Sequence, residues 1–224
     1  RHLAIWDRFL MNAAKLSLEG GPAKRVDAKA EAVLAAAAGE GPEPRATLAR
    51  LLHEGVSPGV SDEYGRQPLH HAAFGDALDA ARILYDCGAD VDAADGGGNR
   101  PLHVAAARGS GAVLDFLLGC AAVVDASNHD GDRPLHLAAW MGHGGCAARL
   151  LAGDANVDAI NSFGHDPLEN IIERSPAVAK QKARLLAGKR QKPLPPQLQA
   201  CMDLLIAAQA EKRGGAVDAA AGFA

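Results

Sequence analysis

The chain is poor in aromatic residues and in uninterrupted apolar sequence, and each shortage limits the classes of protein to which it can belong. Only 4% of its 224 residues are Phe, Trp or Tyr, so a core of bulky side chains is not expected. No run of about 18 apolar residues occurs, which excludes a membrane-spanning helix. The net charge of −4 lacks the excess of one sign that would attract nucleic acid or an anionic membrane.

Motifs of common catalytic sites are also missing. The chain has no G-x-S-x-G, no P-loop, no G-x-G-x-x-G and no H-E-x-x-H, which are the patterns that position a nucleophile, a phosphate, a dinucleotide or zinc. The glycine run at 96–98 falls in a turn and not between a strand and a nucleotide-binding helix, so we do not expect it to bind phosphate. We predict no enzyme activity, no cofactor and no metal site.

The chain instead repeats one segment at a fixed interval of 33 residues. The segment begins at prolines 68, 101, 134 and 167; it is Pro-Leu-His-x-Ala-Ala in the first three copies and decays to Pro-Leu-Glu in the fourth. A period of this length indicates an array of identical supersecondary units, each of which buries its apolar face against its neighbours. Such an array generally presents a binding surface.

Each unit predicts two short helices. A proline at the first helical position sacrifices no hydrogen bond, and a glycine such as Gly88 can end the second helix in the left-handed conformation. A tight two-stranded turn then leads to the next proline. The helices predicted in this way are 28–38 and 46–53, 68–74 and 78–86, 102–107 and 113–118, 135–140 and 146–151, and 168–173 and 198–210.

The pattern divides the chain into a repeat array, residues 27–211, and two flanking segments. The apolar face of residues 3–18 either covers the open end of the array, which we expect, or docks on a partner. The predicted boundaries are 1–26 for an N-terminal capping helix and linker, 27–61 for a degenerate repeat, 62–94, 95–127 and 128–160 for clear repeats, 161–211 for a degenerate repeat with a basic insertion at 174–198, and 212–224 for a flexible tail.

These repeats closely resemble the ankyrin repeat. The shared features are the turn, the Pro-Leu-His helix start, two antiparallel helices and the Gly-Ala-Asp-Val close, which is complete at residues 88–91. The resemblance implies an all-α ankyrin-repeat solenoid of about five repeats, made of helix-turn-helix units with β-hairpin-like turns, an extra N-terminal helix and an insertion in the last repeat. It also implies a protein-binding module.

Two positions depart from the ankyrin pattern. The threonine that usually precedes the proline, and whose hydroxyl bonds to the neighbouring histidine, is replaced by Gln67, Arg100, Arg133 and Asp166. The asparagine that usually follows the closing valine is replaced by Asp92, Asp125 and Asp158. That asparagine is hydroxylated in some ankyrin proteins, so this modification is not expected here.

Histidine and cysteine also recur in register. His70, His103 and His136 are potential zinc ligands, but one histidine per repeat, with neighbours about 8–10 Å apart, cannot converge on one ion. In ankyrin proteins this histidine is structural and bonds across the loops. Cys87 and Cys120 hold equivalent positions, too far apart for a disulfide, which tolerates at most about 7 Å between Cα atoms. We expect free thiols and an intracellular, cytoplasmic location.

The resemblance places the residues that vary between repeats on one surface. In ankyrin arrays the turns project as fingers and the first helices line a concave face. Aromatic side chains, Met and Arg in such positions are typical of interface cores, although each aromatic could instead pack under an adjacent loop. With the aromatic residues as anchors, the predicted protein-binding residues are Tyr64, Arg66, Phe74, Asn99, Arg108, Asp130, Asp132, Trp140, Met141, Phe163 and His165.

A basic segment interrupts the fourth repeat. From Arg174 to Lys192 the chain has seven positive charges and no acid. Three interpretations are open: a solvated flexible loop, a contact with an acidic protein, and phosphate binding to nucleic acid, which the lack of an aromatic residue for base stacking makes less favoured. The residues that would contact an acidic partner are Lys180, Lys182, Arg184, Lys189, Arg190 and Lys192.

We predict that the chain is a scaffold or adaptor that binds another protein, in a larger assembly, through the concave surface and without catalysis. A rigid, preformed face keeps the ordering cost of binding low. Two alternatives are open. The chain, which begins without Met, could be the substrate-recognition part of a larger enzyme whose catalytic domain lies elsewhere, or it could bind nucleic acid through the basic segment.

Overall fold

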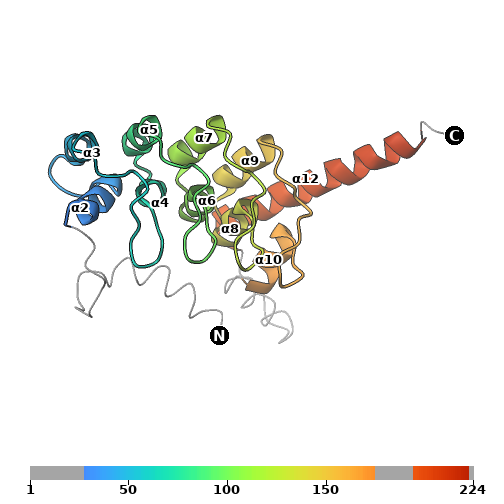
Figure 1. Cartoon of the computed structure of the whole chain (residues 1–224). Helices are drawn as coiled ribbons and strands as arrows, with labels where there is room; N and C mark the ends of the chain where they lie inside the picture. Colours follow the sequence, from blue (N-terminus) through green and yellow to red (C-terminus); the bar gives the residue numbers. More distant parts are fainter. Residues whose placement is uncertain (1–27, 175–193, 222–224) are drawn as a thin grey trace.

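The computed structural model describes residues 28–174 and 194–221, and the side chains of residues 28–172 and 194–212. Every regular element in these ranges is a helix, and the helices stack side by side into an elongated array (Figure 1). The helices are α2 (Ala28–Ala37), α3 (Pro44–His53), α4 (Pro68–Gly75), α5 (Leu78–Asp86), α6 (Pro101–Arg108), α7 (Gly111–Gly119), α8 (Pro134–Met141), α9 (Gly144–Ala152), α10 (Pro167–Arg174) and α12 (Pro196–Ala221).

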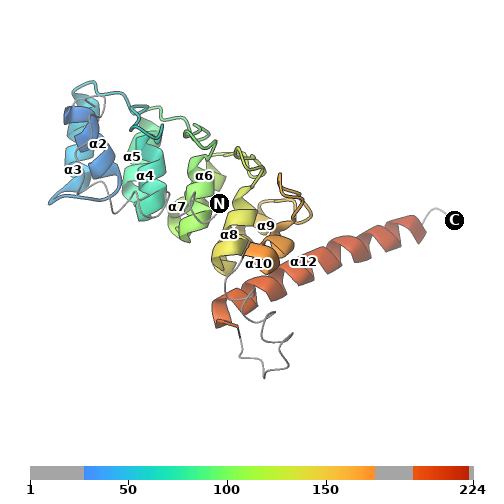
Figure 2. The ribbon, with the colours of Figure 1, turned by 90° about the horizontal axis from the view of Figure 1, so that it is seen from below.

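The helices form two rows. The first helices of the repeats, which are α2, α4, α6, α8 and α10, pack against one another in order, and the second helices, α3, α5, α7, α9 and α12, do the same. Figures 1 and 2 show the two rows side by side, with long loops projecting away from them. We call residues 54–67, 87–100, 120–133 and 153–166 the finger loops. The repeat proline is the first residue of α4, α6, α8 and α10, as the sequence predicted.

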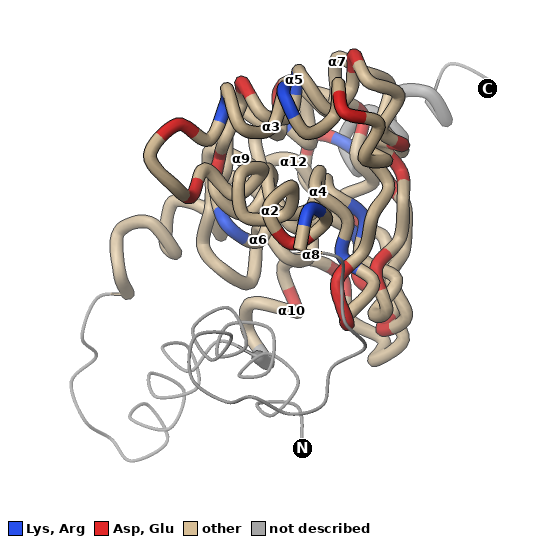
Figure 3. Tube along the Cα trace, turned by 60° about the vertical axis from the view of Figure 1, so that its left-hand side comes forward, with Lys and Arg blue, Asp and Glu red and all other residues tan. Residues whose placement is uncertain are grey.

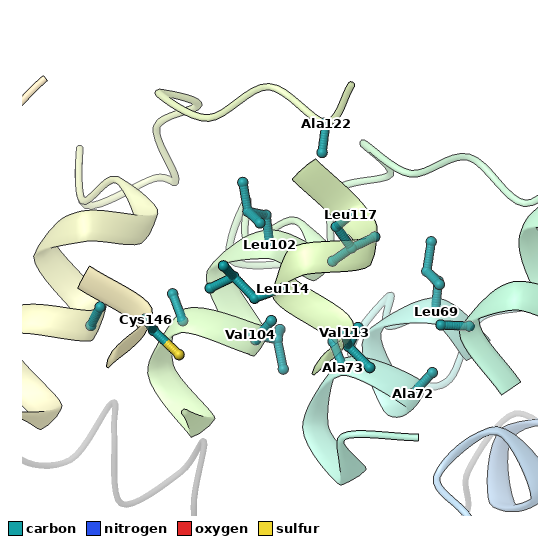
Figure 4. Close-up of a cluster of buried hydrophobic side chains, with 14 of the residues drawn as sticks. Leu69, Ala72, Ala73, Leu102, Val104, Val113, Leu114, Leu117, Ala122 and Cys146 are labelled. Carbon is teal, nitrogen blue, oxygen red and sulfur yellow. The ribbon is translucent and has the colours of Figure 1, made fainter. Parts of the chain in front are cut away.

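One hydrophobic core runs between the rows. Leu84, Leu117 and Leu150 occupy the same position in successive second helices, and all three are fully buried. The first helices contribute pairs of fully buried alanines such as Ala72 with Ala73, whose small side chains let the rows approach closely (Figure 4). Burying one leucine stabilises the folded chain by about 1.5–3 kcal/mol. The 33-residue period therefore repeats the positions that build the hydrophobic core.

Each finger loop is a tight turn closed by its own backbone. In the third loop the N–H of Asn128 donates to the carbonyl oxygen of Asp132, and the N–H of Gly131 donates to that of Asn128, both at 3.0 Å. Gly131 has a φ of +73°, a left-handed conformation that glycine adopts without steric penalty. The turns are therefore closed like hairpins, although no strand is present in the described ranges.

Backbone hydrogen bonds also join each finger loop to the next. The N–H of Gly96 donates to the carbonyl oxygen of Tyr64 at 2.8 Å. The equivalent bonds at the following loops, each 3.0 Å long, run from His129 to Gly97 and from Ser162 to Asp130. The four loops consequently form one connected edge with a fixed spacing.

Helix α12 takes the place of the second helix in the last repeat. Its Cys201 and Leu205 are fully buried and repeat the spacing of Cys146 and Leu150 in α9, but 55 residues later and not 33. The helix packs against both α9 and α10. Twenty-two additional residues therefore separate the two helices of this repeat.

Helix α12 is longer than the other second helices, and polar side chains of its additional turns contact the last finger loop. Gln209 Nε2 donates to Asp166 Oδ2 at 3.0 Å. Lys212 Nζ lies 2.8 Å from Asn156 Oδ1 and 2.8 Å from Asp158 Oδ2. These contacts fasten α12 across the C-terminal end of the array.

Helix α12 continues into the predicted tail, and two other predicted segments lie outside the described residues. Residues 212–221 are helical, where the sequence predicted a flexible tail. The segment is rich in alanine, the strongest helix former, which favours this extension of α12. The N-terminal capping helix and the six basic residues from Lys180 to Lys192 lie outside the described residues.

Substitutions in α12 test its place in the core. Leu205→Ala should lower the free energy of unfolding by about 2 kcal/mol or more, because it opens a cavity at a fully buried position. Ile206→Ala, at the next residue, should change it by less than about 0.5 kcal/mol, because Ile206 is half exposed. Urea unfolding of both variants measures the difference. Equal effects of the two substitutions would show that α12 does not pack here as a second helix.

Candidate protein-binding surface

The predicted binding residues lie at two levels of the array, in the finger loops and in the last turns of the first helices. At the first finger loop the Tyr64 side chain is 39% exposed, and the guanidinium of Arg66 lies 4.9 Å from the centre of its ring. At the end of α8 the Met141 side chain is 37% exposed. Each level therefore offers at least one large side chain to a partner.

The last turns of α4, α6 and α8 form a continuous strip, which we call the inner strip and define as residues 74, 107, 108, 140 and 141. Phe74 is half-buried, and the guanidinium of Arg108 from the next repeat lies 4.1 Å from the centre of its ring, a cation–π contact. Ala107 is buried, and Trp140 is half-buried beside Met141. Since α4, α6 and α8 pack as neighbours, the strip crosses three repeats.

Two of the predicted contact residues are buried inside the finger loops. Arg66 is only 9% exposed, and its Nε donates to Asp62 Oδ2 at 2.8 Å within the same loop. Asp132 is 0% exposed, and its Oδ1 accepts from Asn161 Nδ2 at 2.7 Å. Both side chains stabilise the loops that carry other predicted contact residues, and they offer a partner little or no surface in this structure.

The environment of Asp62 shows how strongly the first finger loop is tied together. Burial alone would raise the pKa of Asp62, but hydrogen bonds from His71 and from Arg66 outweigh it and lower the pKa to about 2. The carboxylate also accepts the backbone N–H of Tyr64 at 2.9 Å. The predicted anchor Tyr64 is consequently held by a side chain that stays ionised at neutral pH.

The other predicted residues of the finger loops are partly accessible. Asn99 is half-buried, with its Nδ2 on Asp95 at 3.2 Å and its Oδ1 accepting from Asn128 Nδ2 at 2.8 Å, so its amide is engaged on both sides. The side chains of Asp130, Phe163 and His165 are half-buried. They remain proposed contact residues, and hydrogen bonds between neighbouring loops fix the backbone turns that carry them.

Sequence reasoning missed two asparagines whose side chains fix these backbone turns. Asn128 Oδ1 accepts the N–H groups of Asp130 and Asp132 at 3.0 and 2.9 Å. Asn161 Oδ1 accepts those of Phe163 and His165, both at 3.0 Å. Their register was the available signal, since both lie at the 33-residue interval that begins with Asp62 and Asp95.

The three recurring histidines are structural, as expected, and bridge neighbouring repeats. The N–H of Arg100 donates to His103 Nδ1 at 3.1 Å, so the ring carries its proton on Nε2, which donates to the carbonyl oxygen of Asp132 at 3.1 Å. His70 and His136 make the same two contacts one repeat away on either side. Burial lowers the pKa of all three rings, that of His103 to about 4. Within the described residues no group of three potential ligands could hold a metal ion.

The two departures from the repeat pattern pair with each other. Arg100, in the place of the threonine, lies 3.1 Å from Asp92, in the place of the asparagine. Arg133 and Asp125 form the same pair at 3.4 Å. Each aspartate also accepts a backbone N–H of the next repeat. In the last repeat the threonine position is itself acidic, and Lys212 of α12 supplies the cation to Asp158 instead.

The second helices also expose aromatic surface that the sequence did not assign to a site. Tyr85 is 44% exposed, and its ring meets that of Phe116 edge to face at 5.8 Å between centroids. A shallow groove lies nearby between α3 and α5, lined by residues that include Pro44, Ala49 and Ile83. This pair lies on the second-helix row and not on the inner strip, so Tyr85 is a control position for binding on the other row.

Comparison with known proteins connects this geometry to one family. The family model described as "Ankyrin repeats (3 copies)" matches residues 2–95 and 93–161. No curated protein matches the chain. Among the helices described, none is long and apolar enough to cross a membrane.

Proposed function

We propose that this chain, which belongs to the ankyrin-repeat family, is a scaffold or adaptor that binds another protein on its finger loops and inner strip. Ankyrin repeats are generally protein–protein interaction modules. The all-helical stack confirms the predicted fold class, an ankyrin solenoid. The proposal assigns no catalytic step to the chain and places its partner in a larger assembly.

The observation that supports this proposal is open apolar surface on a fixed frame. Tyr64 and Met141 are exposed at the two levels of the surface, although large apolar side chains gain most from burial. Backbone hydrogen bonds between the finger loops and the histidine bridges beneath them fix the positions of these side chains. A partner would therefore bind a preformed face and little ordering would oppose it.

Site-specific photo-crosslinking tests where the partner lies. A photoreactive phenylalanine analogue at position 64 or 141 should capture the same cellular protein, because both positions would face it. The same analogue at position 85, which is equally exposed on the second-helix row, should not capture that protein. Capture through position 85 alone would place the interface on the other row and refute the proposal.

Alanine substitution tests the inner strip directly. With the captured protein as ligand, Phe74→Ala should weaken binding by about tenfold or more, since a truncated interface anchor typically loses at least about 1–2 kcal/mol. Tyr85→Ala should leave the affinity unchanged. Calorimetric titration of both variants, after circular dichroism has shown that they fold, decides the result. Unchanged affinity in a folded Phe74→Ala/Trp140→Ala variant would remove the inner strip from the interface.

A further inference from the structure

Negative charge is concentrated in the finger loops. These four segments contain 12 of the 27 acidic residues of the chain and only three of its 23 lysines and arginines. Figure 3 shows acidic positions following one another along the loops on one side of the array. The net charge of the loops is thus more negative than that of the whole chain, which is −4.

The three arginines of the finger loops do not offset this charge at the surface. Arg66, Arg100 and Arg133 each pair with an aspartate of their own loop, at 2.8, 3.1 and 3.4 Å. Their guanidinium groups therefore stabilise the loops and do not neutralise the remaining acidic residues. The charge that remains open to a partner is therefore acidic.

Four acidic residues of the finger loops are exposed, and one of them, Glu54, pairs with Lys29 and Arg50. The other three remain available to a partner. Glu63, Asp90 and Asp154 belong to the first, second and fourth finger loops, and none forms an ion pair with a described lysine or arginine. Half-buried Asp130 adds a carboxylate in the third loop. The exposed apolar ring of Tyr64 lies on the same edge, next to Glu63. The edge is therefore an unpartnered face with acidic groups spread over four repeats.

We infer that the finger loops bind a lysine- and arginine-rich segment of another protein. The inference rests on the proposed protein-binding function and specifies the chemistry of the partner. A single metal ion does not match this face, because the described residues contain no cluster of three ligands. An extended polycation matches it because the acids are distributed from loop to loop.

The spacing of the repeats sets the length of segment that can reach several finger loops. Neighbouring helices pack about 8–10 Å apart, so successive finger loops follow one another at about that interval. The exposed carboxylates lie at different positions within the loops, since Glu63 aligns with Gly96 in the 33-residue register whereas Asp90 aligns with Val123. A polyproline II segment advances about 3.1 Å per residue, so a peptide of about 15 residues is long enough to reach all four loops.

Fluorescence anisotropy with synthetic peptides tests the inference on the full chain. A labelled (Lys-Gly-Ser)5 peptide should bind at about 50 mM NaCl, should lose affinity as salt is raised, and should bind far more tightly than (Glu-Gly-Ser)5. The variant Glu63→Gln/Asp90→Asn/Asp154→Asn should weaken binding at least about tenfold. The matched variant Glu31→Gln/Glu40→Gln/Glu43→Gln, which removes three exposed acids elsewhere, should weaken it less than about twofold.

Three outcomes would overturn the inference. They are no binding of the lysine peptide at low salt, equal weakening by the two triple variants, and a salt-sensitive self-association in sedimentation that the finger-loop variant abolishes. The last outcome would identify the basic residues of a second copy as the ligand. Crosslinking through positions 64 and 141 does not depend on this charge, so a failure here is distinguishable from a failure of the proposed function.

Discussion

Lowering the pH from 7 to 4 should remove about 3 kcal/mol of the free energy of unfolding through His103 alone. The ring has a pKa of about 4 in the folded array against an ordinary value of 6.5, so the unfolded chain takes up the proton first. Its contribution to stability is complete above pH 6.5 and is lost as the pH falls towards 4. Protonation of Nδ1 would place a second donor against the N–H of Arg100 and bury a charge.

Urea unfolding between pH 7 and pH 4 measures this loss, which His70 and His136 should increase because their pKa values are lowered in the same direction. Asp62 adds to the loss of stability mainly at lower pH, because its pKa falls from 3.8 to about 2 on folding and its stabilising effect is lost as the pH approaches 2. His103→Gln, whose amide can still donate to Asp132, should be less stable at pH 7 but should show a shallower decline with acid. A chemical-shift titration of His103 centred near pH 6.5 in the folded protein would contradict the prediction.

Gly131→Ala should lower the free energy of unfolding by about 3 kcal/mol. Alanine at this position would have to adopt a φ of +73°, which costs about 1–2 kcal/mol for a residue that has a Cβ. It would also lie 2.6 Å from the backbone nitrogen of Ser162 in the next finger loop. Overpacking of this kind typically costs a further 1–3 kcal/mol or so, because the hydrogen bond between the two loops leaves little room to move.

Two other glycines separate these contributions. Gly164 has a similar φ of +81° but nothing within 4 Å of the added Cβ, so Gly164→Ala should show the backbone penalty alone. Gly119, at the end of α7, has no such φ and an equally open surrounding, and alanine there should be neutral or slightly stabilising. Thermal and urea unfolding of the three variants should rank them in that order. Similar losses at Gly131 and Gly164 would mean that the loops do not constrain each other.

The repeat period predicted the array because core positions recur with it. Proline at the first helical position, a buried leucine after it and a glycine at the turn act within one repeat, so they are legible in the sequence. Helix α5 begins and ends at the predicted residues 78 and 86. The structural role of the histidines followed from the ankyrin resemblance and from the distance between repeats, which separates the rings.

Accessibility at the finger loops could not be predicted in the same way. Arg66 and Asp132 look exposed in a projecting turn, but each is buried by partners that the fold brings to it: Arg66 by Asp62 in its own loop, and Asp132 by Asn161, 29 residues away. The pairing of Arg100 with Asp92 was equally hidden, because both were noted only as departures from a pattern. The contacts of Gln209 and Lys212 span 43 and 56 residues across an irregular insertion, for which no period is available.

The histidine bridges and the hydrogen bonds between finger loops have a consequence for a chain under tension. In the described part of the array, these bonds join each repeat only to its neighbour, so load passes through the repeats in series. A regular repeat that gives way releases 33 residues, roughly 110–120 Å of extended chain. In the terminal repeat the core positions lie 55 residues from those of its neighbour, which corresponds to roughly 180–200 Å of extended chain. The contacts of Gln209 and Lys212 must break before this length is released. An array pulled from this end would therefore lengthen by a larger step there than at the regular repeats of the described part.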